Sequence, residues 1–301
     1  SNQQRSAGGT ACTGVPPAGS GESMLTTTID GLWVLQVLSG TEVLAPELGL
    51  RPYLPSIETA QTALRHPVAE ELRCAGVIDD SGCVDHPVLE WLTVLSRRDV
   101  ALLVHLQTPS ADAGPERVLL ARFAQWWVTL ARYGSTVRVR GAGITTSEQA
   151  ATLLIATEIQ RLCGAMDPAQ LRPATIAVSE LLAATGEGDG LRAFLNARAF
   201  DSDQVAALTL AADPARSAQA WIVALQSGVC SPASTPVIES GAVTVIDTPQ
   251  GRLVSERVSR DGRAWMIVGP ATTADIASAV RRMMRRLPAQ QSWYSHRKAT
   301  I

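Results

Sequence analysis

Residues that build disulfide frameworks and metal sites are scarce in this sequence. The five cysteines are scattered, odd in number and without a C-x-x-C spacing, and the four histidines show no H-E-x-x-H or H-x-H spacing. Neither a disulfide framework nor a zinc site is therefore expected. No G-x-S-x-G nucleophile motif occurs either. We predict a protein without metal, cofactor or catalytic residues, kept in a reducing, cytoplasmic environment.

An excess of one charge and a long apolar run are also missing. The formal net charge is −2, so no overall field draws the chain toward phosphate backbones or anionic lipids. No segment approaches the roughly 18–20 consecutive apolar residues that a membrane span needs. We therefore predict neither nucleic-acid binding nor membrane insertion.

The segment RRMMRRLPAQQSW (281–293) contains a cluster of arginines that could suggest a nucleic-acid site. On a helix the apolar side chains form one stripe and the arginines lie opposite. The stripe consists of Ile276, Val280, Met283, Met284 and Leu287, and the opposite arc of Arg281, Arg282, Arg285 and Arg286. The pattern indicates the solvated outer face of a helix over 273–287 that packs on a sheet.

The segment GAGITTS (141–147) has the position, between a strand and a helix, of a dinucleotide-binding loop. Thr146 stands where the third glycine of that motif would be, and the flanking strands look antiparallel. We interpret the segment as a tight turn into a helix that runs from Thr145 to about Leu162. Thr145 and Glu148 have the spacing of a capping box at its start.

The chain contains two copies of one order of elements: a short extended segment, helices, four strands and a capped helix. The predicted strands are 99–107, 117–123, 125–132 and 136–140 in the first copy, and 217–226, 241–247, 251–258 and 263–269 in the second. Turn signals between them favour antiparallel pairing. The sequence therefore predicts an α+β fold, an antiparallel sheet covered by helices and helical bundles, with two quasi-symmetric halves.

This pattern also predicts how the chain is divided into segments. Residues 1–23, rich in Gly, Ser, Ala and Pro, are expected to form a disordered leader. The halves are expected at 24–164 and 165–301, packed as one domain. The loop 108–116 is expected to be a mobile hairpin loop that orders when a partner binds.

Seven tryptophans are many for a chain with three tyrosines and three phenylalanines. Trp126 and Trp127 are adjacent on a predicted strand, so their side chains point to opposite faces. One can lie in the core while the other contacts a helix, a partner or solvent. Because tryptophan is enriched at interface hot spots, this strand is a candidate binding surface.

Six segments, in order, resemble the EspG family, the ESX type VII secretion-associated chaperones of mycobacteria. They are TIDGLWVLQVL (28–38), APELGLRPYLP (45–55), ELRCAGVIDDSGCVD (71–85), RVLLARFAQWWVTLARYGSTVRV (117–139), VIDTPQGRLV (245–254) and LPAQQSW (287–293). The first half looks most similar to the family member that serves the first ESX system. The resemblance implies a quasi-symmetric α+β fold.

The resemblance also implies a cytosolic, non-enzymatic chaperone that binds the tip of the PPE subunit of a PE–PPE heterodimer. Such a chaperone keeps its substrate soluble and directs it to its secretion system, through the sheet and the C-terminal helical region. We place the contacts on Trp127, Arg138, Arg140, Asp203 and Gln204. Monomer and dimer both remain open, and the alternative function is a small-molecule-binding protein or enzyme with a site between the halves.

Overall fold

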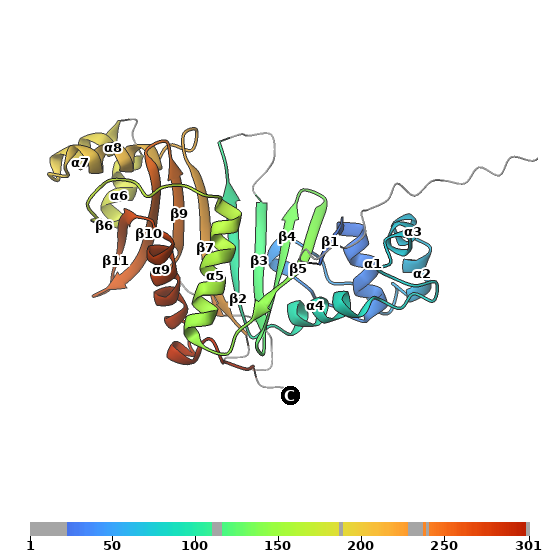
Figure 1. Ribbon diagram of the computed structural model, residues 1–301. Helices are drawn as coiled ribbons and strands as arrows, with labels where there is room; N and C mark the ends of the chain where they lie inside the picture. The colour runs from blue at the N-terminus through green and yellow to red at the C-terminus, as the bar shows by residue number, and fades with distance from the viewer. Residues whose placement is uncertain (1–22, 110–115, 187–188, 228–236, 239–240, 299–301) are drawn as a thin grey trace, which may run out of the picture.

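The computed structural model describes residues 23–109, 116–186, 189–227, 237–238 and 241–298. The strands are β1 (Met24–Thr28), β2 (Val100–Gln107), β3 (Glu116–Phe123), β4 (Trp126–Tyr133), β5 (Thr136–Ile144), β6 (Ala174–Ala177), β7 (Ala218–Gln226), β8 (Val237–Ile238), β9 (Val243–Thr248), β10 (Gly251–Arg260) and β11 (Arg263–Pro270). They form one antiparallel sheet in the order β1-β5-β4-β3-β2-β7-β9-β10-β11-β6, and β8 also pairs with β7 (Figure 1). The predicted α+β class and antiparallel pairing are confirmed.

The two halves of the chain occupy the two halves of this sheet in mirrored order. β1-β5-β4-β3-β2 comes from the first half and β7-β9-β10-β11-β6 from the second. They meet at the antiparallel β2–β7 pair, which we call the seam, where Leu103 lies opposite Val223. The predicted quasi-symmetric halves are confirmed, and the boundary between 164 and 165 stays a prediction.

Helices lie on both faces of the sheet. They are α1 (Ile29–Ser39), η1 (Pro46–Leu48), α2 (Ala60–Leu64), α3 (Pro67–Cys74), α4 (His86–Arg97), α5 (Glu148–Cys163), α6 (Val178–Thr185), α7 (Gly190–Ala197), α8 (Ser202–Ala211), α9 (Thr273–Arg285) and η2 (Gln290–Ser292). The neighbouring helices α5 and α9 cover the centre of one face. α1–α4 and α6–α8 pack on the opposite face, at the two ends of the sheet (Figure 1).

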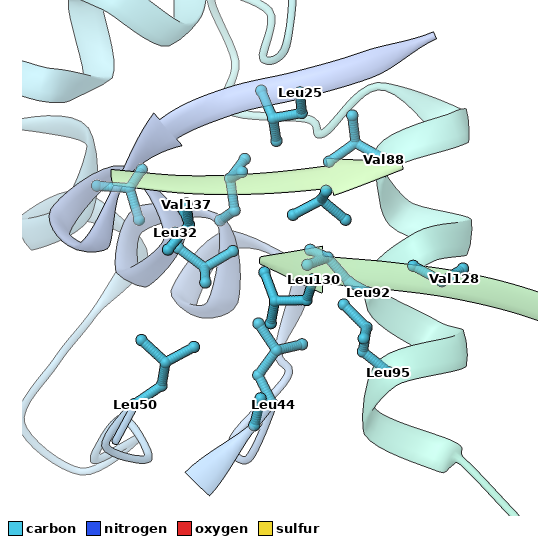
Figure 2. Packing of buried hydrophobic residues seen from close by; sticks show 14 of the residues in the cluster. Leu25, Leu32, Leu44, Leu50, Val88, Leu92, Leu95, Val128, Leu130 and Val137 are labelled. Atoms are coloured by element: carbon cyan, nitrogen blue, oxygen red, sulfur yellow. The ribbon is translucent and has the colours of Figure 1, made fainter. Parts of the chain in front are cut away.

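The core of the first half forms where α1 and α4 pack on the sheet. Leu32 of α1 and Leu92 of α4 are fully buried and face Leu130 of β4 (Figure 2). Val137 of β5 joins them. Alternation along each strand places these side chains on one face and leaves the neighbouring residues for the helices of the other face. The apolar pattern of the sequence therefore supplies core residues on both sides of the sheet, in one cluster under α5 and α9 and in two on the opposite face, under α1–α4 and under α6–α8.

Side-chain caps define the starts of α1 and α5. The N-cap of α1 is Thr28, whose hydroxyl accepts from Gly31 N. The N-cap of α5 is Ser147, whose hydroxyl accepts from Ala150 N. The predicted start at Thr145 is wrong because the Thr145 hydroxyl accepts a hydrogen bond from Trp127.

The arginine-rich segment has the predicted arrangement. Met283 and Met284 are fully buried, whereas the four arginines of α9 and its end are exposed. α9 begins with a capping box between Thr272 and Asp275. Two of the arginines also form ion pairs with neighbouring elements, Arg282 with Glu256 of β10 and Arg285 with Glu148 of α5. The segment is thus the outer face of a covering helix, and its charges fasten that helix to its surroundings.

The expected leader and loop cannot be compared with the fold. Residues 1–22 and 110–115, which make up most of the predicted leader (1–23) and loop (108–116), lie outside the described residues.

Candidate docking surface

The centre of the sheet is unevenly covered on its two faces. On the α5/α9 side Leu102, Val104, Ile222 and Ala224 are at most 3 % exposed. On the opposite side Ala101 and Leu225 are buried at one end of the seam, whereas the seam residues that follow, between the two groups of helices, remain half-buried. This surface, the central strip, consists of Leu103, His105, Trp221 and Val223, with the exposed Arg117 of β3 beside them. A half-buried apolar strip on a rigid sheet is a platform on which a partner can bury further apolar area.

His105 and Trp221 form the aromatic centre of the strip. They lie opposite each other on β2 and β7, with ring centroids 5.4 Å apart. The Nε2 atom of His105 is buried and makes no hydrogen bond within the described part of the chain. Burial, the larger cause, and the nearby charge of Arg117 lower the pKa of His105 below its usual value. The imidazole is therefore mainly neutral at pH 7, and the centre of the strip carries no charge.

A cavity of about 190 Å³ lies between α6–α8 and the second half of the sheet. Its walls are mainly apolar and include Leu181, Leu191 and Leu208 from the helices, and Ile246 and Met266 from the strands. Trp221 lines it as well as contacting His105. The cavity therefore borders the central strip, and together they form a surface that runs from the seam to the C-terminal helices.

Trp127 does not belong to this surface. It is 1 % exposed and packs in the core under α5. Its Nε1 donates to the Thr145 hydroxyl at 2.7 Å. The register between β4 and β5 shifts at Trp127 and Val128, and the neighbouring Trp126 is the exposed one, at 49 %. Trp127, one of the predicted contact residues, is therefore a core residue in this fold.

The remaining predicted contact residues are divided between the two faces of the sheet. Arg140 forms an ion pair with Glu158 of α5, and Arg138 is exposed on the same side. Asp203 and Gln204 lie on α8, which packs on the opposite face at the far end. Asp203 is exposed, but Gln204 is 7 % exposed. The structure does not bring these residues together.

Gln204 has a structural explanation. Its Oε1 accepts from the main-chain N of Asp201 at 3.0 Å, and its Nε2 donates to the carbonyl of Arg172 at 3.1 Å. With the Asp201 carboxylate, which accepts from Gln204 N, it forms the capping box of α8. Gln204 therefore fastens the start of α8 to the segment before β6.

The residues of the central strip were missed by sequence reasoning. Both faces of β2 and β7 are apolar in sequence, so alternation alone does not show which face the helices leave open. The tryptophan count was the available signal, because Trp221 is one of the seven.

Two further features of the described residues bear on function. Among them, no group of three or more His, Cys, Asp and Glu side chains is placed to hold a metal ion. None of the helices described has the length and apolar character that crossing a membrane requires.

A model of the EspG family matches residues 28–282 of the chain. The ESX-2 secretion-associated protein EspG2 of Mycobacterium tuberculosis (strain CDC 1551 / Oshkosh) is 46 % identical over 276 residues, covering 91 % of this chain and 99 % of the relative. The ESX-1 secretion-associated protein EspG1 of Mycobacterium marinum is 24 % identical over 292 residues, covering 94 % and 96 %. The expected greater likeness to the member of the first ESX system is therefore corrected, because the ESX-2 relative has the higher identity.

A solved structure has the same fold. The Mycobacterium tuberculosis type VII secretion system chaperone EspG5, in complex with the PE25–PPE41 dimer, superposes with a TM-score of 0.70 at 24 % identity. The match covers 91 % of this chain and 100 % of that chain. The sheet with its two groups of helices, the family match over most of the chain and the identity with EspG2 lead to one conclusion: the chain belongs to the EspG family.

Proposed function

We propose that this chain is a cytoplasmic chaperone that binds a PE–PPE heterodimer through its PPE subunit. It keeps the heterodimer soluble and directs it to a type VII secretion system. Membership of the EspG family supports this function over a small-molecule-binding protein or an enzyme, and the related fold of EspG5 was solved with a PE25–PPE41 dimer. The role requires recognition and release of a protein, so no covalent chemistry is assigned to the chain.

The observation that carries this proposal is the uncovered seam. Leu103, Trp221 and Val223 form a preformed apolar platform whose backbone is held by hydrogen bonds on both sides. A partner that seals such a platform gains from burying aromatic side chains while little chain entropy is lost. An exposed apolar tip of a helical protein suits this surface, because the tip would otherwise aggregate.

The proposed interface extends from the strip to the C-terminal helices. A stable protein interface buries about 800 Å² on each partner, which is more than a few strand residues provide. Leu182 of α6 is 67 % exposed and Asp203 is exposed on α8, so these helices offer an apolar contact and a polar rim. Arg138 and Arg140 lie on the other face and are left out of the proposed interface.

Co-expression tests the function. Tagged PE–PPE pairs are each produced with and without this chain. The products are analysed by size-exclusion chromatography with light scattering. The proposal expects at least one pair that is insoluble or aggregated alone and forms a stoichiometric complex with this chain. Recovery of every pair equally well without the chain, and no complex with any pair, would contradict it.

A further inference from the structure

The C-terminal segment returns to the seam after α9. Residues 287–298 pass the end of the sheet where β2 begins and β7 ends. Within this segment Trp293 is fully buried, and its Nε1 donates to the Glu148 carboxylate at 3.0 Å. Leu287 and Trp293 therefore anchor the segment in the core, although all of it lies beyond the residues matched by the family model.

A buried pair of opposite charges receives this segment on the first half of the sheet. The side chains of Asp99 and Arg122 are both 0 % exposed. The guanidinium of Arg122 donates to the carbonyls of Trp293 and His296, at 3.1 Å and 2.7 Å, and also to that of Ala124. The Asp99 carboxylate accepts from the main-chain N of Lys298 at 2.8 Å. Main-chain groups of the tail thus supply hydrogen bonds to both buried charges.

Loss of these hydrogen bonds would destabilise the folded protein. A charge buried in a protein requires an opposite charge and hydrogen bonds to replace its hydration. Burial lowers the pKa of Arg122 to about 10, against the opposing effect of Asp99, so the guanidinium still carries its charge at pH 7. Without the tail, two of its carbonyl acceptors would be absent.

The same segment holds the second half of the sheet. The main-chain N of Ala289 donates to the Gln226 side chain at 2.9 Å. The Nε2 atom of His296 lies 3.1 Å from the carbonyl oxygen of Ser227, whose own N donates to the Asp99 carbonyl at 2.9 Å. The tail therefore contacts both strands of the seam at their common end.

We infer that residues 287–298 form a clip that holds the two halves of the sheet together at the seam and thereby positions the central strip for its partner. Val100 and Gln226 are opposite each other at the clipped end, and along the same strand pair follow Leu103 opposite Val223 and His105 opposite Trp221. The strip takes its two sides from different halves, so its shape depends on how firmly the seam is closed. The positioning role rests on the proposed docking function, whereas the closure of the seam does not.

Two variants test the clip. A chain that ends at Tyr294 loses His296 and Lys298 but keeps the buried Trp293, and Arg122→Met removes the receiving charge. Arg51→Met is the matched control, because Arg51 is a 63 % exposed arginine that also pairs with a carboxylate, that of Glu58. Amide hydrogen exchange is measured for peptides at the seam and at the β4–β5 pair, together with the affinity for a PE–PPE heterodimer.

We expect exchange at the clipped end of the seam to rise about tenfold in the shortened chain and in Arg122→Met, with little change at β4–β5. Affinity for the heterodimer should fall about tenfold in both variants and stay unchanged in Arg51→Met. The double variant should resemble the single ones, because both changes open the same contact.

Three outcomes would overturn the inference. Exchange that is unchanged at the seam would show that the tail does not hold it, and exchange that rises equally in all strands would indicate a general stability effect. A looser seam with unchanged affinity would remove the positioning role. If the unaltered chain binds no PE–PPE pair, the docking proposal fails and the positioning role with it, while the exchange rates still decide whether the clip closes the seam.

Discussion

The imidazole of His105 and the indole of Trp221 meet across the seam, with ring centroids 5.4 Å apart, and each comes from a different half of the chain. The contact joins the two halves at the centre of the uncovered face. Because Trp221 also lines the cavity under α6–α8, this pair connects the first half of the sheet with the C-terminal helices. A partner bound at this pair would contact residues of both halves.

The neutral state of His105 predicts a pH dependence of stability. Its pKa is lowered in the folded protein, so between the folded value and the unfolded value of about 6.5 the unfolded chain binds more protons. Stability contributed by this group is present above the unfolded pKa and is lost as the pH falls below it. Urea unfolding of the unaltered chain and of His105→Gln at pH 7.5 and 5.5 measures the difference. The unaltered chain should lose more stability on acidification, and an equal loss in both would contradict the assignment.

The buried hydrogen bond of Trp127 predicts a contrast between adjacent tryptophans. Trp127→Phe removes the donor to Thr145 and leaves a buried hydroxyl without this partner, so the free energy of unfolding should fall by about 1–3 kcal/mol. Trp126→Phe, at a 49 % exposed position, should change it by less than about 0.5 kcal/mol. Chemical denaturation followed by circular dichroism compares the two. Equal effects would mean that Trp127 is not buried as described.

The adjacent residues Gln204 and Asp203 of α8 should also differ in how much they contribute to stability. Gln204→Ala breaks the capping box and the bond to Arg172, and should destabilise the protein by about 1 kcal/mol. Asp203→Ala, at an exposed neighbouring position, should leave stability nearly unchanged. Thermal unfolding compares the two variants. A Gln204→Ala variant as stable as the unaltered chain would contradict the structural role of Gln204.

The regular elements were predictable because their signals are local. Turn residues and alternating apolar residues indicated the strands, and the apolar stripe from Ile276 to Leu287 indicated the last helix. The start of α5 was mistaken by contrast, since Thr145 and Ser147 are both good caps. The hydrogen bond from Trp127, distant in sequence, occupies the Thr145 hydroxyl and leaves the cap to Ser147.

The candidate surface was less predictable because its exposure depends on which part of the sheet the helices leave uncovered. Leu103 and Val104 look alike in sequence, yet α5 and α9 bury one face of β2 and the opposite face at the seam stays partly open. Trp126 and Trp127 point to opposite faces by ordinary strand alternation, and only the face of Trp127 is covered by α5, which leaves Trp126 49 % exposed. The buried partners of the C-terminal segment, Asp99 and Arg122, are separated from it by most of the chain.

Affinity of Trp221→Ala for a PE–PPE heterodimer, beside that of Trp126→Ala, tests the central claim most directly. Both changes remove a partly exposed tryptophan, but only Trp221 lies on the central strip. Isothermal titration, with thermal unfolding to confirm that each variant is folded, should show Trp221→Ala weaker by at least about 2 kcal/mol, as expected for an aromatic hot spot, and Trp126→Ala unchanged. Unchanged affinity in Trp221→Ala, or a larger loss in Trp126→Ala, would contradict docking at the seam.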